Sequence, residues 1–184
     1  MTSPKIESIV TQNGKIVFES STGRLDLNGG LRLNAVKQFS HSHGKDTLLS
    51  AFEFTYDHFQ SGTGNVFSDF RLRLEKVQQR GNTLAPNDTQ PPYRFTYQSG
   101  PIPNRLSHNL DHWGYINDAN GTNNIPLTTY LGKTYGGIDR SSNASSMKKG
   151  SLIKITYPTG GSANFEYEPH YVYDSLLIQE IDSF

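Results

Sequence analysis

The sequence predicts an all-β domain whose sheet is predominantly antiparallel, and three observations support this prediction. Apolar residues alternate with polar ones along most of the chain, which is the periodicity of half-buried strands. Asn, Gly, Pro and Ser residues separate these runs, as turn formers do. No segment keeps a helical apolar stripe for more than about two turns. We therefore expect about eight strands, joined by hairpins into a β-sandwich or a curved open sheet with two long loops.

The N-terminal half predicts a hairpin followed by longer strands. Residues Ile6–Val10 and Lys15–Glu19 alternate in the β pattern and flank Asn13-Gly14, a dipeptide typical of a tight hairpin turn. We expect Gly14 to supply the positive φ that such a turn requires. The other elements expected in this half are strands at residues 31–36, 48–57 and 70–75 and a hairpin tip at residues 41–46.

The C-terminal half predicts a second hairpin. Leu152–Tyr157 is rich in β-branched and aromatic residues, and Pro158 removes a backbone donor where the strand must stop. We expect Gly160 and Gly161 to turn the chain with positive φ. The remaining strands expected in this half are residues 93–98, a returning strand that includes Phe165 and Tyr167, and a final strand at residues 176–181.

Two long connections, Gly81–Pro92 and Ser99–Lys149, interrupt the strand pattern. The second is too long for an ordinary loop, so we expect it to contain short turns or strands of its own. It holds several large apolar residues among polar ones, including Trp113, Tyr115, Ile116, Ile125, Leu127 and Leu131. Because a soluble monomer rarely exposes such a patch, we expect this loop to fold onto the sheet with Trp113 largely buried.

Composition narrows the class of protein. The 184 residues predict a single β-rich domain over residues 1–184. The 17 basic residues balance the 17 acidic ones, so no overall field favours nucleic acid as a partner. The absence of cysteine excludes a disulfide framework and a thiolate nucleophile. No apolar run approaches the ~18 residues of a membrane helix, and Met1–Val10 lacks a signal-peptide pattern, so we expect no membrane insertion by this segment.

Histidine and aspartate pairs offer only weak metal-site patterns. His108 and His112 have the spacing of two ligands on one helical face, but they lack a long helix and a clear third ligand. His41 and His43 lie in an expected hairpin tip, and the oxygen-rich stretch that begins at Asp118 lacks the closing Glu of a calcium loop. No G-x-S-x-G nucleophile motif occurs. We therefore expect no metal, no cofactor and no catalytic residue.

The order of several short motifs resembles the region just upstream of the YD repeats in very large bacterial Rhs-type surface or secreted proteins. These motifs are P-P-Y-R-F-T-Y (Pro91–Tyr97), I-P-N-R-L-S (Ile102–Ser107), D-H-W-G-Y-I-N (Asp111–Asn117), G-I-D-R (Gly137–Arg140) and G-S-L-I-K-I-T-Y-P-T-G-G (Gly150–Gly161). The motif run covers about residues 52–173. No Y-D-x-x-G-R core repeat is present, so the ability to form a repeat shell is not carried over.

The resemblance implies a non-enzymatic structural or interaction module that belongs to a larger exported repeat protein. Its partner would be the remainder of that polypeptide, with a surface glycan or another protein as a further partner. The expected location is therefore secreted or at the cell surface, with the signal peptide outside this chain.

A carbohydrate-binding β-sandwich is the alternative interpretation. Aromatic rings on loops stack on sugars or anchor an interface, and Trp113 and Tyr115 lie close together in the longer loop. With the neighbouring His112 and Asp111 they form the candidate binding site of this alternative.

Overall fold

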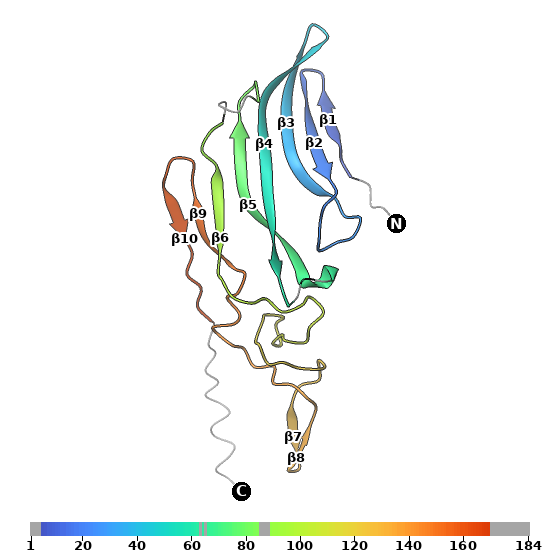
Figure 1. Cartoon of the computed structure of the whole chain (residues 1–184), viewed down its shortest axis with the longest axis vertical. Helices are drawn as coiled ribbons and strands as arrows, with labels where there is room; N and C mark the ends of the chain where they lie inside the picture. Colours follow the sequence, from blue (N-terminus) through green and yellow to red (C-terminus); the bar gives the residue numbers. More distant parts are fainter. Residues whose placement is uncertain (1–4, 63, 65, 85–88, 170–184) are drawn as a thin grey trace.

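The structure is a computed structural model that describes residues 5–62, 64, 66–84 and 89–169. It is all-β, as the sequence predicts, with an eight-stranded antiparallel sheet and a separate two-stranded hairpin (Figure 1). Within the described residues the only helical element is the short 3-10 turn η1 (Phe67–Asp69). The predicted final strand at residues 176–181 lies outside the described residues.

The strands of the large sheet follow one another as antiparallel neighbours with a single interruption. Their bounds are β1 (Ser8–Thr11), β2 (Gly14–Ser21), β3 (Arg32–Ser42), β4 (Lys45–Gln60), β5 (Phe70–Arg80), β6 (Tyr93–Tyr97), β9 (Leu152–Thr156) and β10 (Ser162–Asn164). Their order in the sheet is β1-β2-β3-β4-β5-β6-β9-β10. Between β6 and β9 the chain leaves the sheet, forms the small hairpin β7 (Thr128–Tyr130) and β8 (Lys133–Tyr135), and returns to the adjacent position.

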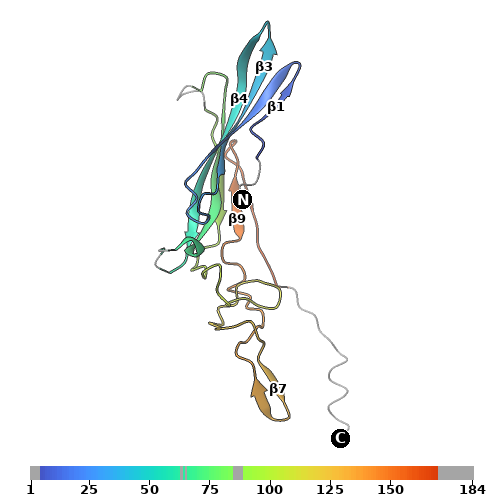
Figure 2. The same cartoon turned by 90° about the vertical axis from the view of Figure 1, so that its right-hand side faces the viewer.

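Of the two predicted architectures, the structure has the curved open sheet. Figure 2 shows the large sheet nearly edge-on as one twisted layer. No second sheet of the described residues packs against it, because the only other strands, β7 and β8, lie beyond its end (Figures 1 and 2).

The register of the strands sorts the side chains onto two chemically different faces. Directly opposed residues share a face, and Phe18, Val36 and Phe52 are opposed across β2, β3 and β4. The same face continues across the sheet and is called the apolar face here; it carries Ile9, Ile16, Phe18, Val36, Phe52, Phe54, Val77, Tyr93, Phe95, Ile155 and Tyr157. Alternation with period two in seven neighbouring strands, β1 to β6 and β9, therefore produces one continuous apolar surface.

The opposite face is polar and is crossed by ion pairs between neighbouring strands. Nζ of Lys37 lies 2.6 Å from Oε1 of Glu19, and Nε of Arg80 lies 2.7 Å from Oε2 of Glu53. Ala51 is opposed to both Lys37 and Arg80 and is fully buried, because the aliphatic stems of its long neighbours cover a side chain this small. The charged side chains of this face are compatible with exposure to water.

The apolar face has no cover from the described residues. The buried apolar residues of the described chain are Ala35, Ala51, Ile102, Ile116 and Ile138, and none of them belongs to the apolar face. Phe52, for example, keeps 38% of its surface exposed although it lies on a central strand. Five of the eleven residues of the apolar face are exposed and the other six are partly exposed, so this face has the composition of a core without its burial.

Turn geometry corrects part of the sequence prediction. In the first hairpin Thr11 pairs with Gly14, so Gln12-Asn13 forms the two-residue turn and Gly14 is not in the left-handed region. The prediction of a positive φ for Gly14 was therefore wrong. Glycine is needed there because a Cβ would lie far inside van der Waals distance of the Phe39 carbonyl oxygen on β3.

The two other turns follow the prediction more closely. The tip between β3 and β4 is a two-residue turn in which His43 and Gly44 both have positive φ, +51° and +73°, as a type I′ turn requires. In the second hairpin Gly160 donates to the Tyr157 carbonyl at 3.0 Å and has φ +89°, whereas Gly161 is not left-handed. The positive φ predicted for Gly161 was therefore wrong. The returning strand β10 ends at Asn164, so the prediction that it includes Phe165 and Tyr167 was wrong too; the last backbone hydrogen bond to β9 runs from the Phe165 N–H to the Ile153 carbonyl at 2.9 Å.

Replacing Gly14 tests the close approach of β2 to β3. We expect Gly14→Val to lower the free energy of unfolding by about 2 kcal/mol, because the added side chain forces the two strands apart. Gly161→Ala is the control, since its Cβ would meet only Tyr157 at 4.0 Å and its φ suits alanine. Urea denaturation that shows equal stabilities for the two variants would contradict this account.

A buried carboxylate joins the sheet to the loops at its end. Asp26, in the connection between β2 and β3, accepts hydrogen bonds from Nε and Nη2 of Arg24 at 3.0 and 2.6 Å. Nε2 of His58, on β4, lies 3.8 Å from Oδ1 of Asp26, and Nη1 of Arg105 lies 3.9 Å from Oδ2. Because Arg24 stabilises the charged form, the pKa of Asp26 lies below its usual value despite the opposing effect of burial.

The lowered pKa makes the contribution of Asp26 depend on pH. A carboxylate of lowered pKa stabilises the fold above its unfolded pKa of about 4, and this stabilisation is lost as the pH falls through the folded pKa. We expect Asp26→Asn to cost about 2 kcal/mol at pH 7 and much less near pH 3. In the control Asp57→Asn, the carboxylate is 55% exposed beside Arg73, so the expected loss is below about 1 kcal/mol. Urea titrations at both pH values check this, and a loss for Asp26→Asn that does not change with pH would contradict it.

Candidate functional site

The predicted binding loop forms a lobe beyond one end of the large sheet. This loop lobe comprises residues 99–149 and extends away from the strands instead of lying over their apolar face (Figures 1 and 2). Trp113 is 81% exposed. The expectation that the loop folds onto the sheet with Trp113 buried was therefore wrong, and the physical reason lies in the residue two positions earlier.

Asp111 is the centre of the loop lobe, and its side chain is fully buried. Its Oδ1 accepts the backbone N–H groups of Trp113 and Tyr115 at 2.8 and 2.9 Å. Its Oδ2 accepts the hydroxyl of Ser142 at 2.9 Å. The buried carboxylate thereby draws the loop backbone inward, and the side chain of Trp113 is left to point outward.

Backbone contacts close the same turn. The Asp111 N–H donates to the Tyr115 carbonyl at 2.8 Å, and Gly114 has φ +90°, a conformation that suits glycine. Arg140 donates from Nη2 to the Asp111 carbonyl at 2.6 Å. Hydrogen bonds to both the side chain and the backbone of Asp111 therefore fix the conformation of this turn.

A second buried amide extends this polar interior. Asn117 donates from Nδ2 to the carbonyls of Asp139 and Ser141 at 3.0 and 3.3 Å, and it is 6% exposed. Ile116 and Ile138 supply the buried apolar contacts of the lobe near it. The lobe is thus organised by hydrogen bonds around Asp111 and Asn117, and isoleucines, not Trp113, are its buried apolar residues.

The four predicted binding residues therefore have unequal roles. His112, Trp113 and Tyr115 lie on the surface of one turn, with Tyr115 54% exposed. Asp111 lies beneath them and positions the turn. Sequence reasoning missed Arg140 and Ser142, which are distant in the chain; the Asp-x-x-Gly spacing from Asp111 to Gly114 is the local turn signal that indicates part of this geometry.

Two histidines of the metal-site patterns, His41 and His108, form side-chain hydrogen bonds. Nδ1 of His108 lies 2.9 Å from the side-chain oxygen of Asn124, and Nδ1 of His41 lies 2.8 Å from Asp46. In the part of the chain that the structure describes, no three His, Cys, Asp or Glu side chains are grouped as metal ligands would be. The expectation of no metal remains a prediction that elemental analysis can test.

Asp118, the start of the stretch that we compared with a calcium loop, takes part in a different interaction. Its carboxylate accepts the Ser146 hydroxyl at 2.6 Å and forms an ion pair with Lys149. Lys149 and then Ser146 hold the pKa of Asp118 below its usual value. This carboxylate therefore joins the middle of the loop lobe to its last residues, which lead into β9.

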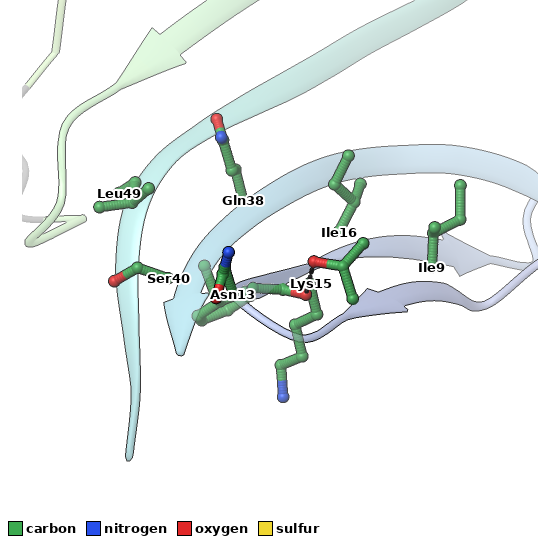
Figure 3. Close-up of a pocket in the computed structure, with 10 residues that line it drawn as sticks. Ile9, Asn13, Lys15, Ile16, Gln38, Ser40 and Leu49 are labelled. Atoms are coloured by element: carbon green, nitrogen blue, oxygen red, sulfur yellow. Dashed lines mark hydrogen bonds between the residues drawn. The ribbon is translucent and has the colours of Figure 1, made fainter. Parts of the chain in front are cut away.

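One shallow hollow lies at the other end of the molecule, beside the first hairpin turn (Figure 3). It has a volume of about 260 Å³ and is lined by Ile9, Thr11, Asn13, Gly14, Lys15, Ile16, Gln38, Phe39, Ser40 and Leu49. Lys15 is the only titratable lining residue. The hollow therefore presents no pair of groups for acid and base chemistry.

Comparisons with known proteins add no relative: no protein-family model, curated protein or solved structure matches the chain. Over the described residues, no helix has the length and apolar character needed to cross a membrane. The arrangement of the surface is therefore the main evidence on function.

Replacing Asp111 tests whether its buried carboxylate holds the candidate site. We expect Asp111→Ala to cost about 3 kcal/mol, because two backbone N–H groups and the Ser142 hydroxyl lose their acceptor. Asp111→Asn keeps one carbonyl oxygen for the two N–H groups and should cost less than half as much. Urea denaturation of both variants is the measurement. Equal losses, or none, would show that Asp111 does not organise the turn.

Proposed function

We propose that this chain is a non-enzymatic structural module of a larger exported protein of the Rhs or YD-repeat type, and that its apolar face packs against the remainder of that protein. The single observation that carries this proposal is a large sheet with one ion-paired polar face and one uncovered apolar face. Exposed apolar patches of this size usually mark surfaces that a partner or another segment covers in the functional protein.

The size of the apolar face fits a packing surface. The seven strands that carry the apolar face, about 4.8 Å apart, span about 29 Å, and five residues along a strand span about 17 Å. The flat footprint is therefore about 500 Å² before side-chain relief is counted, more than half of the ~800 Å² that each partner buries in a standard interface. A second apolar sheet would pack about 10 Å away, as in a β-sandwich.

The edges of the sheet support the same proposal. The edge strands are β1 and β10, and every residue of β1 is exposed. Exposed edges offer backbone groups to further strands, and proteins usually protect or continue them. A module within a longer β-rich polypeptide has neighbouring segments that can do both.

The resemblance to the segment upstream of YD repeats gives the proposal its family and its location. The longest of its motifs, Gly150–Gly161, forms β9 and the turn toward β10. A segment of an exported repeat protein would lie at the cell surface or be secreted. Its principal partner would be the rest of the same polypeptide.

Substitution on one face of β4 tests the packing role. We expect the isolated chain to bind the dye ANS and to self-associate, because the apolar face is uncovered. Phe52→Lys should reduce both, whereas Thr55→Lys, on the opposite face, should change neither. Light scattering after size exclusion and ANS fluorescence are the measurements, with circular dichroism as the control for folding. A wild-type chain that stays monomeric and binds no dye would contradict the proposed packing role.

The coding sequence around the chain tests the family assignment separately. The proposal requires Y-D-type repeats downstream in the same reading frame. A short open reading frame that ends without such repeats would remove the Rhs assignment and leave the packing role to be judged from the dye and light-scattering measurements.

A carbohydrate-binding module is the second candidate, and the exposure of Trp113 is the observation that favours it. An exposed indole on a turn that Asp111 holds in place is the kind of flat platform on which sugars stack. Tyr115 and His112 lie on the same turn and would contribute a second ring and a polar contact.

A glycan array with a matched variant tests this candidate. If the platform binds sugars, Trp113→Ala should abolish the array signal while changing the free energy of unfolding by less than about 0.5 kcal/mol, as expected for an exposed side chain. Leu106→Ala is the control, since Leu106 is an exposed apolar residue of the same lobe. An array without signal, or signals unaffected by Trp113→Ala, would reject the carbohydrate candidate.

A further inference from the structure

The β7–β8 hairpin projects from the far end of the loop lobe, away from the large sheet (Figures 1 and 2). All residues from Asn124 to Gly137 are exposed, and the exposed large apolar side chains among them are Ile125, Leu127, Tyr130, Leu131 and Tyr135. Neither the apolar face nor the Trp113 turn includes this hairpin. It is therefore a separate surface feature.

The base of the hairpin is anchored firmly. Ile138 is 2% exposed, and the Leu127 N–H donates to its carbonyl at 2.8 Å. A Cβ on Gly121 would overlap the Ile138 side chain, and one on Gly136 would overlap the Pro126 carbonyl, so both positions require glycine. Close packing at the base holds the exposed tip in a defined position.

The tip carries an apolar residue where the backbone disfavours one. Leu131 and Gly132 form the two-residue turn, with φ of +49° and +71°. Asn, Asp or Gly is normally found at the first of these positions, because a bulky residue is strained in the left-handed region. Leu131 is nevertheless 84% exposed, so no contact within the described residues compensates for the strain. Strain of this kind is typical of functional positions.

The side chains on one face of the hairpin indicate the chemistry of a surface that could bind it. Tyr130 is opposed to Lys133 and Tyr135 to Thr128, so both tyrosines and the lysine share one face. Lys133 is the only charged residue between positions 119 and 138. A surface that buries Leu131 and Tyr130 must therefore be apolar, and it gains from a carboxylate near Lys133.

We propose that the β7–β8 hairpin is a docking finger that inserts Leu131 and Tyr130 into an apolar pocket of a protein partner with an acidic residue at its rim. Tyrosine is enriched at the centres of protein interfaces, where its ring is buried and its hydroxyl remains bonded. An anionic membrane is less favoured, because surface binding relies on clusters of basic residues and the finger has one.

Site-specific photo-crosslinking in the cells that make the protein tests the finger. The photoreactive residue p-benzoylphenylalanine replaces Tyr130, and the same residue in place of Tyr115 is the control on another exposed aromatic of the lobe. We expect the Tyr130 position to cross-link to one protein segment that is apolar and carries Asp or Glu, as mapped by mass spectrometry, and the Tyr115 position not to reach it. Lipid adducts, scattered products or none would overturn the proposal.

Binding of the purified mapped segment provides the second arm. We expect Leu131→Asp to weaken its affinity at least tenfold and Lys133→Glu to weaken it about threefold to tenfold. Phe52→Lys should leave the affinity unchanged, which separates this site from the packing role of the apolar face.

Leu131→Asn separates docking from a purely structural role. Asparagine tolerates positive φ, so we expect Tm to rise by about 2–4 °C while the mapped segment binds at least tenfold more weakly. A fall in Tm, or unchanged binding, would show that Leu131 is not a docking residue.

Discussion

The different chemistry of the two faces of the large sheet is the constraint on which the rest of the structure depends. Cross-strand register places Phe18, Val36 and Phe52 on one face and the ion pairs of Glu19 and Glu53 on the other. A shift of one residue in any strand would exchange its apolar and charged side chains between the faces. The register is therefore set by side-chain chemistry, although one face meets no cover from the described residues.

Because few apolar side chains are buried, the conformations of the loops are fixed largely by hydrogen bonds and ion pairs of buried polar side chains. Asp26 joins the β2–β3 connection to β4, and Asp111 fixes the turn that presents Trp113. Each of these buried carboxylates accepts several hydrogen bonds, which offsets the cost of removing it from water. Loops anchored in this way can keep their apolar side chains outside. The exposure of Trp113 follows from this arrangement.

The sequence predicted the strands well because alternation and turn residues are local signals. The hairpin tip at His43-Gly44 and the outgoing strand of the second hairpin were correct to within a residue or two, whereas the returning strand ends before Phe165 and Tyr167. Gly14 was correctly identified as a required glycine for the wrong reason, because the approach of the Phe39 carbonyl is a contact between strands. The prediction that Trp113 is buried was wrong because it rested on hydrophobicity alone. The bonds that Asp111 receives from Ser142, 31 residues later, cannot be inferred from local pattern.

The most direct measurement of the central claim uses the absence of cysteine from the chain. Phe52→Cys places a thiol on the apolar face, and Thr55→Cys places one on the polar face of the same strand. The rate of modification by a water-soluble maleimide is then compared between the isolated chain and the complete polypeptide in which we propose that it lies. If the apolar face is a packing surface, the thiol at position 52 reacts in the isolated chain and is protected in the complete polypeptide, while the thiol at position 55 reacts in both. Equal reactivity at position 52 in both forms would contradict the account.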